Sequence, residues 1–176
     1  GAEKNLPLIA EDLGIITDGV RALMDKFCLP GMKVLLFAFG ADIADNPYSL
    51  HNMCKNAVVY TGTHDNNTVL GWWKEETSAA DRLRFRNYTG ESGEFDVSFR
   101  MARMALSSVA DTAVIPMQDI LGLGSVCRMN TPGVGIGNWK WRMTNDELMK
   151  ISDKRSSVTI KYRELNELFG RTYRVC

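Results

Sequence analysis

The sequence has few of the residues that build covalent or metal-bound scaffolds. Its 176 residues include only two histidines and four cysteines, which are widely scattered and show no CxxC or Cys/His spacing. Structural zinc sites need closely spaced ligands of these types. We therefore expect no disulfides and no metal site, and we place the chain in a reducing, cytoplasm-like compartment.

Long hydrophobic runs and an excess of one charge are also missing. No apolar run approaches the roughly 20 residues that span a bilayer, and Lys plus Arg equals Asp plus Glu, at 21 each. Without a bulk positive field, we predict neither a nucleic-acid partner nor a membrane partner, and a neutral ligand fits better. The chain has no initiator Met and no signal-peptide pattern, and an apolar run starts at Leu6. We expect a chain that begins in the middle of a fold.

Short apolar runs that end in polar or glycine-rich loops are what the sequence does contain. We predict strands at 6–10, 32–39, 57–60 and 113–117. Helices are expected at 15–29 (with Thr17 or Asp18 as N-cap), around 70–73, at 78–87 (with Ser78 as N-cap), at 94–109, from the capping box at 144–147, and around 158–169. A glycine-rich loop fills 121–138.

Strands that are apolar throughout, alternating with helices, predict an α/β fold with a parallel sheet. A doubly wound sheet and a (β/α)8 barrel both fit this pattern. Polar or glycine-rich loops follow all four strands, which favours the barrel. Glu11 and Asp65 lie about 54 residues apart, which fits two barrel units of roughly 30 residues each. We therefore predict that residues 1–176 form one partial domain, half a (β/α)8 barrel plus terminal helices.

Two carboxylates form the strongest chemical pattern. Glu11 and Asp65 each follow a predicted buried strand, with one strand between them. Across a barrel mouth, one such group can protonate a glycosidic oxygen while another stabilises positive charge at the anomeric carbon. A single carboxylate in this position is more often a helix N-cap or a partner in a loop hydrogen bond, and only the repetition of the pattern makes the catalytic interpretation as good as this one.

The order and spacing of several motifs along the sequence resemble those of a known family. These motifs are similar in order and spacing to those of the carboxyl-terminal half of a 4-α-glucanotransferase, also called amylomaltase or disproportionating enzyme. The match covers nearly the whole chain. The motifs are Ile9-Ala10-Glu11-Asp12-Leu13-Gly14, Leu29-Pro30-Gly31-Met32-Lys33-Val34, Phe37-Ala38-Phe39, Asn46-Pro47-Tyr48, Tyr60-Thr61-Gly62-Thr63-His64-Asp65-Asn66 and the segment from Gly122 through Asn130-Thr131-Pro132-Gly133 to Asn138-Trp139.

The resemblance implies a retaining α-1,4-glucan transferase on a (β/α)8 barrel, with α-1,4-glucan or maltooligosaccharide as substrate and no metal or cofactor. By motif, Glu11 is the general acid/base and Asp65 the transition-state stabiliser. His64 matches the histidine that binds the sugar at the cleavage point, Asp12 matches an acceptor-side carboxylate, and Asn66 joins them as a substrate-binding residue. Of the four tryptophans we expect Trp72 and Trp73 in the core, and Trp139 and Trp141 as candidates for stacking on sugars.

The chain departs from the family pattern in one consequential way. The nucleophilic aspartate of the family belongs to an Arg-x-Asp-His-type segment that precedes the acid/base glutamate, and residues 1–176 contain no such segment. We therefore expect the chain to be inactive alone and to need a missing amino-terminal half as its partner. The alternative is a non-catalytic α-glucan-binding or regulatory fragment.

Smaller departures are Asn67, where many relatives have aspartate, and the apolar segment 133–137. The cytoplasm, or a plastid if the source is a plant, is the expected location.

Overall fold

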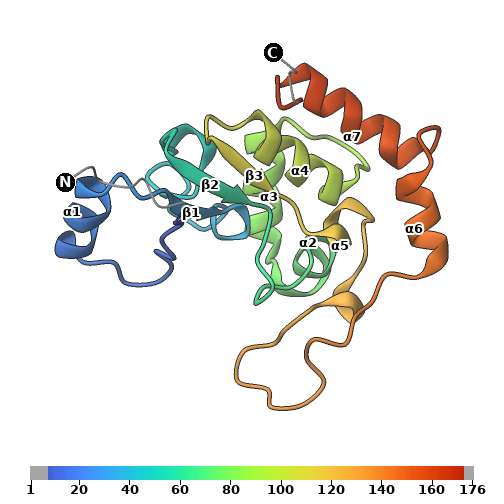
Figure 1. Cartoon of the computed structure of the whole chain (residues 1–176), viewed down its shortest axis with the longest axis horizontal. Helices are drawn as coiled ribbons and strands as arrows, with labels where there is room; N and C mark the ends of the chain where they lie inside the picture. The colour runs from blue at the N-terminus through green and yellow to red at the C-terminus, as the bar shows by residue number, and fades with distance from the viewer. Residues whose placement is uncertain (1–7, 173–176) are drawn as a thin grey trace.

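The computed structural model describes residues 8–172, which form a small parallel sheet flanked by helices (Figure 1). Its three strands, β1 (Gly31–Val34), β2 (Ala57–Tyr60) and β3 (Thr112–Val114), lie in the order β1-β2-β3. Both pairings are parallel, with Tyr60 of β2 opposite Val34 and Val114. The carboxyl ends of the strands therefore share one edge of the sheet. The predicted α/β class with parallel strands is confirmed.

The strand predicted at 32–39 is much shorter in the structure. β1 ends at Val34, and Leu35–Phe37 form a 3-10 turn instead. The side chain of Asn46 donates to the Phe37 carbonyl at 3.0 Å, which gives this backbone group a partner outside any sheet. The run at 32–39, which is apolar except for Lys33, thus continues from a strand into a turn, and it places Val34, Leu35 and Leu36 in the core while Phe37 is exposed.

The ends of the sheet correct two other predictions. Of the strand predicted at 6–10, residues 6 and 7 lie outside the described residues, and 8–10 form no strand, although the Ala10 amide donates to the Pro30 carbonyl at 2.9 Å. The strand predicted at 113–117 ends at Val114. Pro116 has no N–H to donate to a sheet, and it precedes the short helix α5 (Met117–Ile120).

Helices connect the strands, and their ends follow the capping residues in the sequence. α1 (Asp18–Lys26) begins after Thr17, as predicted. α3 (Ala79–Thr89) begins with a capping box in which the Ser78 hydroxyl accepts from the Asp81 amide, and it ends at Gly90 in the left-handed conformation. α4 (Val97–Ser107) is capped by Asp96. These three helices confirm the predictions at 15–29, 78–87 and 94–109, with ends shifted by a few residues.

A less common element follows β2. α2 (Val69–Gly71) continues directly into a π-helix at Trp72–Glu76. Trp72 is buried in the core and Trp73 packs against the same cluster, so the prediction that this pair serves packing is confirmed. The core lies between the sheet, the π-helix, α3 and α4, and it includes Phe39, Phe85 and Met101. Two methionines of α4, Met101 and Met104, are part of it.

The two last helices, α6 (Asn145–Ser152) and α7 (Ser157–Leu168), lie beyond the sheet and pack against each other (Figure 1). The predicted capping box of α6 is present, with Thr144 and Glu147 bonding each other's backbone amides. α7 also contacts α4. In the part of the chain that the structure describes, no helix has the length and apolar character needed to cross a membrane, and Cys28, Cys54 and Cys127 are free thiols.

One arginine fastens the end of the described chain to α4. The guanidinium of Arg171 donates to the carbonyls of Leu106, Ser108 and Ala110 at 2.7, 3.1 and 2.8 Å. Hydrogen bonds from a charged group are worth more than neutral ones, so Arg171→Ala should lower the free energy of unfolding by about 2 kcal/mol. Urea denaturation measures this loss. Arg155→Ala, at an exposed position, is the matched control, and equal effects of the two changes would contradict the prediction.

Candidate active site at the carboxyl edge of the sheet

The end of β2 is held tightly before the polar turn begins. The Thr61 amide donates to the Val114 carbonyl at 3.4 Å, and the Leu36 amide donates to the Thr61 carbonyl at 3.3 Å. A Cβ on the next residue, Gly62, would lie 2.9 Å from Leu36 Cδ1, so only glycine fits there without a shift. The segment after Gly62 therefore leaves the sheet at a fixed point.

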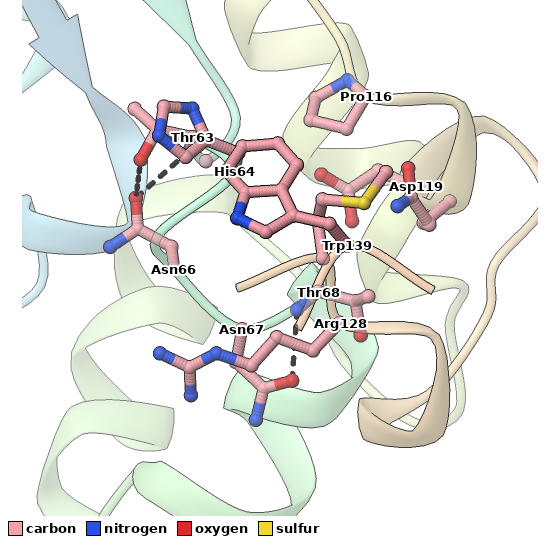
Figure 2. A pocket seen from close by; sticks show the side chains of 12 residues that line it. Thr63, His64, Asn66, Asn67, Thr68, Pro116, Asp119, Arg128 and Trp139 are labelled. Carbon is pink, nitrogen blue, oxygen red and sulfur yellow. Dashed lines mark hydrogen bonds between the residues drawn. The ribbon is translucent and has the colours of Figure 1, made fainter. Parts of the chain in front are cut away.

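Asn66 shapes the turn that carries the predicted catalytic and sugar-binding groups. Its Oδ1 accepts from both the backbone amide and the hydroxyl of Thr63, at 2.8 and 2.9 Å (Figure 2). Short polar side chains often stabilise turns by such local bonds. The turn sets His64 and Asp65, both exposed, at the carboxyl edge of the sheet.

Asp65 lies between a histidine and an amide. Its Oδ1 is 3.3 Å from His64 Nε2 and accepts a hydrogen bond from Asn130 Nδ2 at 2.5 Å. The backbone N–H of Asn130 also donates to the His64 carbonyl, at 3.0 Å. The carboxylate is therefore oriented by contacts from the glycine-rich loop at 121–138, far along the chain.

The same loop brings a tryptophan to the histidine. The ring centroids of His64 and Trp139 are 5.0 Å apart, with the planes inclined at 39°. Trp139 has a positive φ of 62° and is 53% exposed, and its amide donates to the Met129 carbonyl at 2.7 Å. Figure 2 shows its ring beside His64. Of the two tryptophans predicted to stack on sugars, Trp139 has an open ring at the site.

Both predicted catalytic carboxylates border one cleft. Glu11, His64 and Asp65 line a hollow of about 370 Å³, together with Tyr60 of β2 and Val114 of β3. This volume is in the range of small-molecule sites. We call it the carboxylate cleft. The two groups predicted from positions far apart in the chain thus meet at the carboxyl edge of the sheet.

A second hollow lies beside the first. It measures about 200 Å³ and shares His64 with the carboxylate cleft, and its other walls include Asn66, Asp119, Arg128 and Trp139 (Figure 2). We call it the tryptophan pocket. The two hollows also share Gly62, Thr63 and Pro116, and His64 lines both the one with Glu11 and Asp65 and the one with the indole ring of Trp139.

Asp12 has a different environment from Glu11. Its Oδ1 accepts from the Met32 amide at 2.6 Å, and its carboxylate occupies the space beside Gly31, where an added Cβ would be 2.5 Å from Oδ2. The chain between Glu11 and β1 is thus tied to the start of the strand. This contact fixes the segment that presents Glu11.

Asp119 is a buried carboxylate beneath the site to which the sequence assigned no role. It follows β3, and only 2% of its surface is exposed. Oδ2 accepts from the Thr61 hydroxyl at 2.6 Å, and Oδ1 accepts from the Val69 amide at 2.8 Å. Burial raises the pKa of Asp119, while these two hydrogen bonds act in the opposite direction. Its position at a strand end was the available signal, but its partners could not be read from the sequence.

Within the described residues, no group of three or more His, Cys, Asp or Glu side chains is arranged to hold a metal ion. The groups that the structure brings to the site include the carboxylates of Glu11 and Asp65, the imidazole of His64 and the amide of Asn66. Paired carboxylates next to hydrogen-bonding and aromatic groups are typical of sites that act on glycosidic bonds.

Comparison with known protein families identifies the chain. The sequence model of the 4-alpha-glucanotransferase family matches residues 1–148. The chain belongs to this family. It is 50% identical over 169 residues to the 4-alpha-glucanotransferase of Synechocystis sp., a match that covers 95% of this chain and 32% of that protein. It is 46% identical over 166 residues to the chloroplastic/amyloplastic 4-alpha-glucanotransferase of Arabidopsis thaliana, covering 94% and 28%.

A solved structure gives a consistent result for the fold. Amylomaltase from Streptococcus agalactiae in complex with acarbose superposes with a TM-score of 0.87 and 28% sequence identity, over 96% of this chain and 32% of that chain. The chain thus spans about a third of the length of its relatives. The family predicted from the ordered motifs is confirmed.

Proposed function

We propose that this chain supplies the acid/base and the transition-state stabiliser of a retaining 4-α-glucanotransferase that moves α-1,4-glucan segments between maltooligosaccharides. The observation that carries the proposal is that Glu11 and Asp65 border the same cleft, with His64 beside them. In these roles Glu11 protonates the leaving glycosidic oxygen and later deprotonates the acceptor hydroxyl. Asp65 stabilises the positive charge that develops at the anomeric carbon.

The neighbouring polar groups suit the binding of a sugar. His64 lines both hollows, so an N–H of its imidazole can donate to a sugar hydroxyl. The amide nitrogen of Asn66 is a further donor, because its oxygen is already bonded to Thr63. The exposed face of Trp139 offers a stacking surface. Asp12 contributes to the acceptor side by holding the segment of Glu11, since its carboxylate binds the Met32 amide.

The proposal includes a partner, the amino-terminal part of the relatives, which would complete a (β/α)8 barrel. Two features support it. In the described sheet β1 and β3 each pair on one side only, which leaves two strand edges that barrel closure would remove. The apolar residues Val20 and Leu23 of α1, and Phe27 directly after it, are also exposed, and no residue of α1 is buried. In Figure 1, α1 stands at one end of the molecule beyond β1. We propose that the partner covers these surfaces and supplies the nucleophile.

The location of the enzyme is a further part of the proposal. The Arabidopsis relative is named as chloroplastic/amyloplastic, and Synechocystis has a relative that is 50% identical. We place the present chain in the cytoplasm of a microbe or in a plastid, where glucan chains are handled. Immunolocalisation or fractionation of the source cells tests this placement.

A maltotriose assay tests the proposed function. The 176-residue chain is compared with a joined protein, in which it replaces the matching third of the Synechocystis relative. We expect no glucose release from the chain alone, because a retaining mechanism needs the nucleophile, and release of glucose with longer oligosaccharides from the joined protein. The relative's amino-terminal part alone is the control. Turnover by the isolated chain would refute the predicted inactivity, and a folded but inactive joined protein would refute the assigned roles.

A further inference from the structure

A π-helix contacts the residue that follows the turn of Asp65, because Asn67 donates to Glu76. It extends from Trp72 to Glu76, following α2, whose first turn is capped by the Thr68 hydroxyl at 3.1 Å from the Gly71 amide. Single π-turns are rare, and they occur frequently at functional sites. Here the π-turn places Glu76, its last residue, against the turn and the glycine-rich loop.

Glu76 contacts both of these segments through one oxygen. Its Oε1 accepts from Asn67 Nδ2 at 2.9 Å and lies 3.5 Å from Arg128 Nη1. Asn67 also donates to Ser125 Oγ at 3.2 Å, and its own Oδ1 accepts from the Thr68 amide at 2.9 Å (Figure 2). One carboxylate thus holds the turn, through Asn67, and the loop, through Arg128.

Arg128 carries this connection to the catalytic carboxylate. Its Nη2 donates to the Asp65 carbonyl at 2.7 Å, and its Nε donates to the Asn130 carbonyl at 2.8 Å. The same Asn130 binds the Asp65 carboxylate from its side chain. The planar guanidinium therefore bonds the backbone of Asp65 and the backbone of the residue that orients its side chain.

We infer that Glu76 and Arg128 are positioning residues that hold the Asp65 carboxylate at the carboxylate cleft. Glu76 orients the guanidinium, and Arg128 fixes Asn130 relative to Asp65. The catalytic meaning of this inference rests on the role proposed above for Asp65, whereas the structural link stands without it. The pair is partly shielded from water, with side-chain exposures of 23% for Arg128 and 44% for Glu76.

The contacts of the pair lie at the site and not in the core. The partners of Arg128 are Asp65, Asn130 and Glu76, all outside the hydrophobic cluster. Losing the guanidinium should therefore disturb the site much more than the global fold. A merely stabilising residue would instead lower the melting temperature and the active fraction together.

The test uses matched variants in the 176-residue chain and in the joined protein. Glu76→Gln keeps an acceptor for Asn67 but removes the charge that faces Arg128. Glu75→Gln is its control, at the exposed neighbouring position. Arg128→Met removes the guanidinium but keeps the aliphatic chain, and Arg128→Lys tests whether a single ammonium group can replace the planar group.

In the isolated chain, NMR follows the backbone amide of Asn130. We expect its hydrogen exchange to be about tenfold faster in Arg128→Met and partly faster in Glu76→Gln. Glu75→Gln should leave it unchanged, and the melting temperature should move little in all three. An unchanged Asn130 signal in Arg128→Met would overturn the inference, as would indistinguishable effects of Glu76→Gln and Glu75→Gln.

In the joined protein, maltotriose kinetics separate positioning from folding. We expect Arg128→Met to lower kcat by roughly 10- to 100-fold with a smaller change in KM, because a displaced catalytic group weakens transition-state binding most. Arg128→Lys should recover only part of this loss. A fall in kcat that follows the unfolded fraction would overturn the inference. If the joined protein with the unaltered chain has no activity, the proposed function fails, and the NMR comparison alone decides the positioning role.

Discussion

Replacing Asp65 with asparagine should abolish glucan transfer by the joined protein, with a loss of about 1,000-fold in kcat. The negative charge of Asp65 would face an oxocarbenium-like transition state, and preorganised charges of this kind contribute the largest single part of many rate enhancements. Asparagine has the same shape and can still accept from Asn130, which bonds Asp65 Oδ1 in the structure. Charge is therefore the main difference between the two proteins, and initial rates with maltotriose measure its effect.

The matched partner variant is Glu11→Gln, which removes the proton donor and should reduce kcat by at least about 100-fold. Asp111→Asn serves as the control, because Asp111 precedes β3 at the opposite edge of the sheet and lies near Lys55. Its activity should equal that of the parent. Near-normal transfer by either Asp65→Asn or Glu11→Gln would remove that residue from the mechanism, and a second carboxylate would then have to be sought.

Replacing Asp119 with leucine should cost about 2–4 kcal/mol of unfolding free energy, the largest stability effect that we expect. The change leaves the Thr61 hydroxyl and the Val69 amide buried without their acceptor. A buried donor without an acceptor lowers the free energy of unfolding. Asp119→Asn should cost less, because its oxygen can still accept from one partner and its nitrogen can donate to the Thr61 hydroxyl oxygen. Urea denaturation of the parent, Asp119→Asn and Asp119→Leu measures their unfolding free energies, which should decrease in this order.

The difference in unfolding free energy between the parent and Asp119→Asn should depend on pH. Burial is the main cause that raises the pKa of Asp119 above its usual value, so the folded chain retains this proton more strongly than the unfolded chain does. The contribution of the group to stability is then fully present below the ordinary pKa of aspartate, and it is lost as pH rises through the raised pKa. The advantage of the parent over Asp119→Asn in unfolding free energy should therefore shrink as pH rises above the ordinary pKa of aspartate. An advantage that grows with pH would show that the hydrogen bonds outweigh burial.

Those features of the fold that depend on local chemistry could be predicted from the sequence. The strand at 57–60 was correct because its residues are apolar throughout, and the capping boxes at Ser78 and Thr144 were correct because their hydrogen bonds are local. The end of β1 could not be predicted. An apolar run does not reveal where the backbone stops pairing, since the turn at Leu35–Phe37 depends on a bond from Asn46, nine residues beyond Phe37.

In the candidate site, too, some residues could be predicted from the sequence and their long-range contacts could not. Glu11, His64 and Asp65 were predicted from apolar runs that end in polar residues and from family motifs, and the structure places them on one cleft, although residues 8–10 before Glu11 form no strand. The contacts of Asp65 with Asn130 and Arg128 were not found, because they join segments more than 60 residues apart. Asp12 shows a related difficulty. Its motif predicts a carboxylate on the acceptor side, and the sequence could not reveal that its Oδ1 accepts from the backbone amide of Met32, 20 residues along the chain.

The π-helix makes the position of Glu76 depend on the length of the chain more than on the identity of its neighbours. A π-turn holds one residue more than an α-turn, and each residue of a helix turns the chain by about 100°. Deleting one residue between Trp73 and Glu76 would let the segment close as an α-helix and would swing the carboxylate away from Arg128. Lys74 and Glu75 are exposed, so this stretch accepts exchanges of side chains while it resists insertions and deletions.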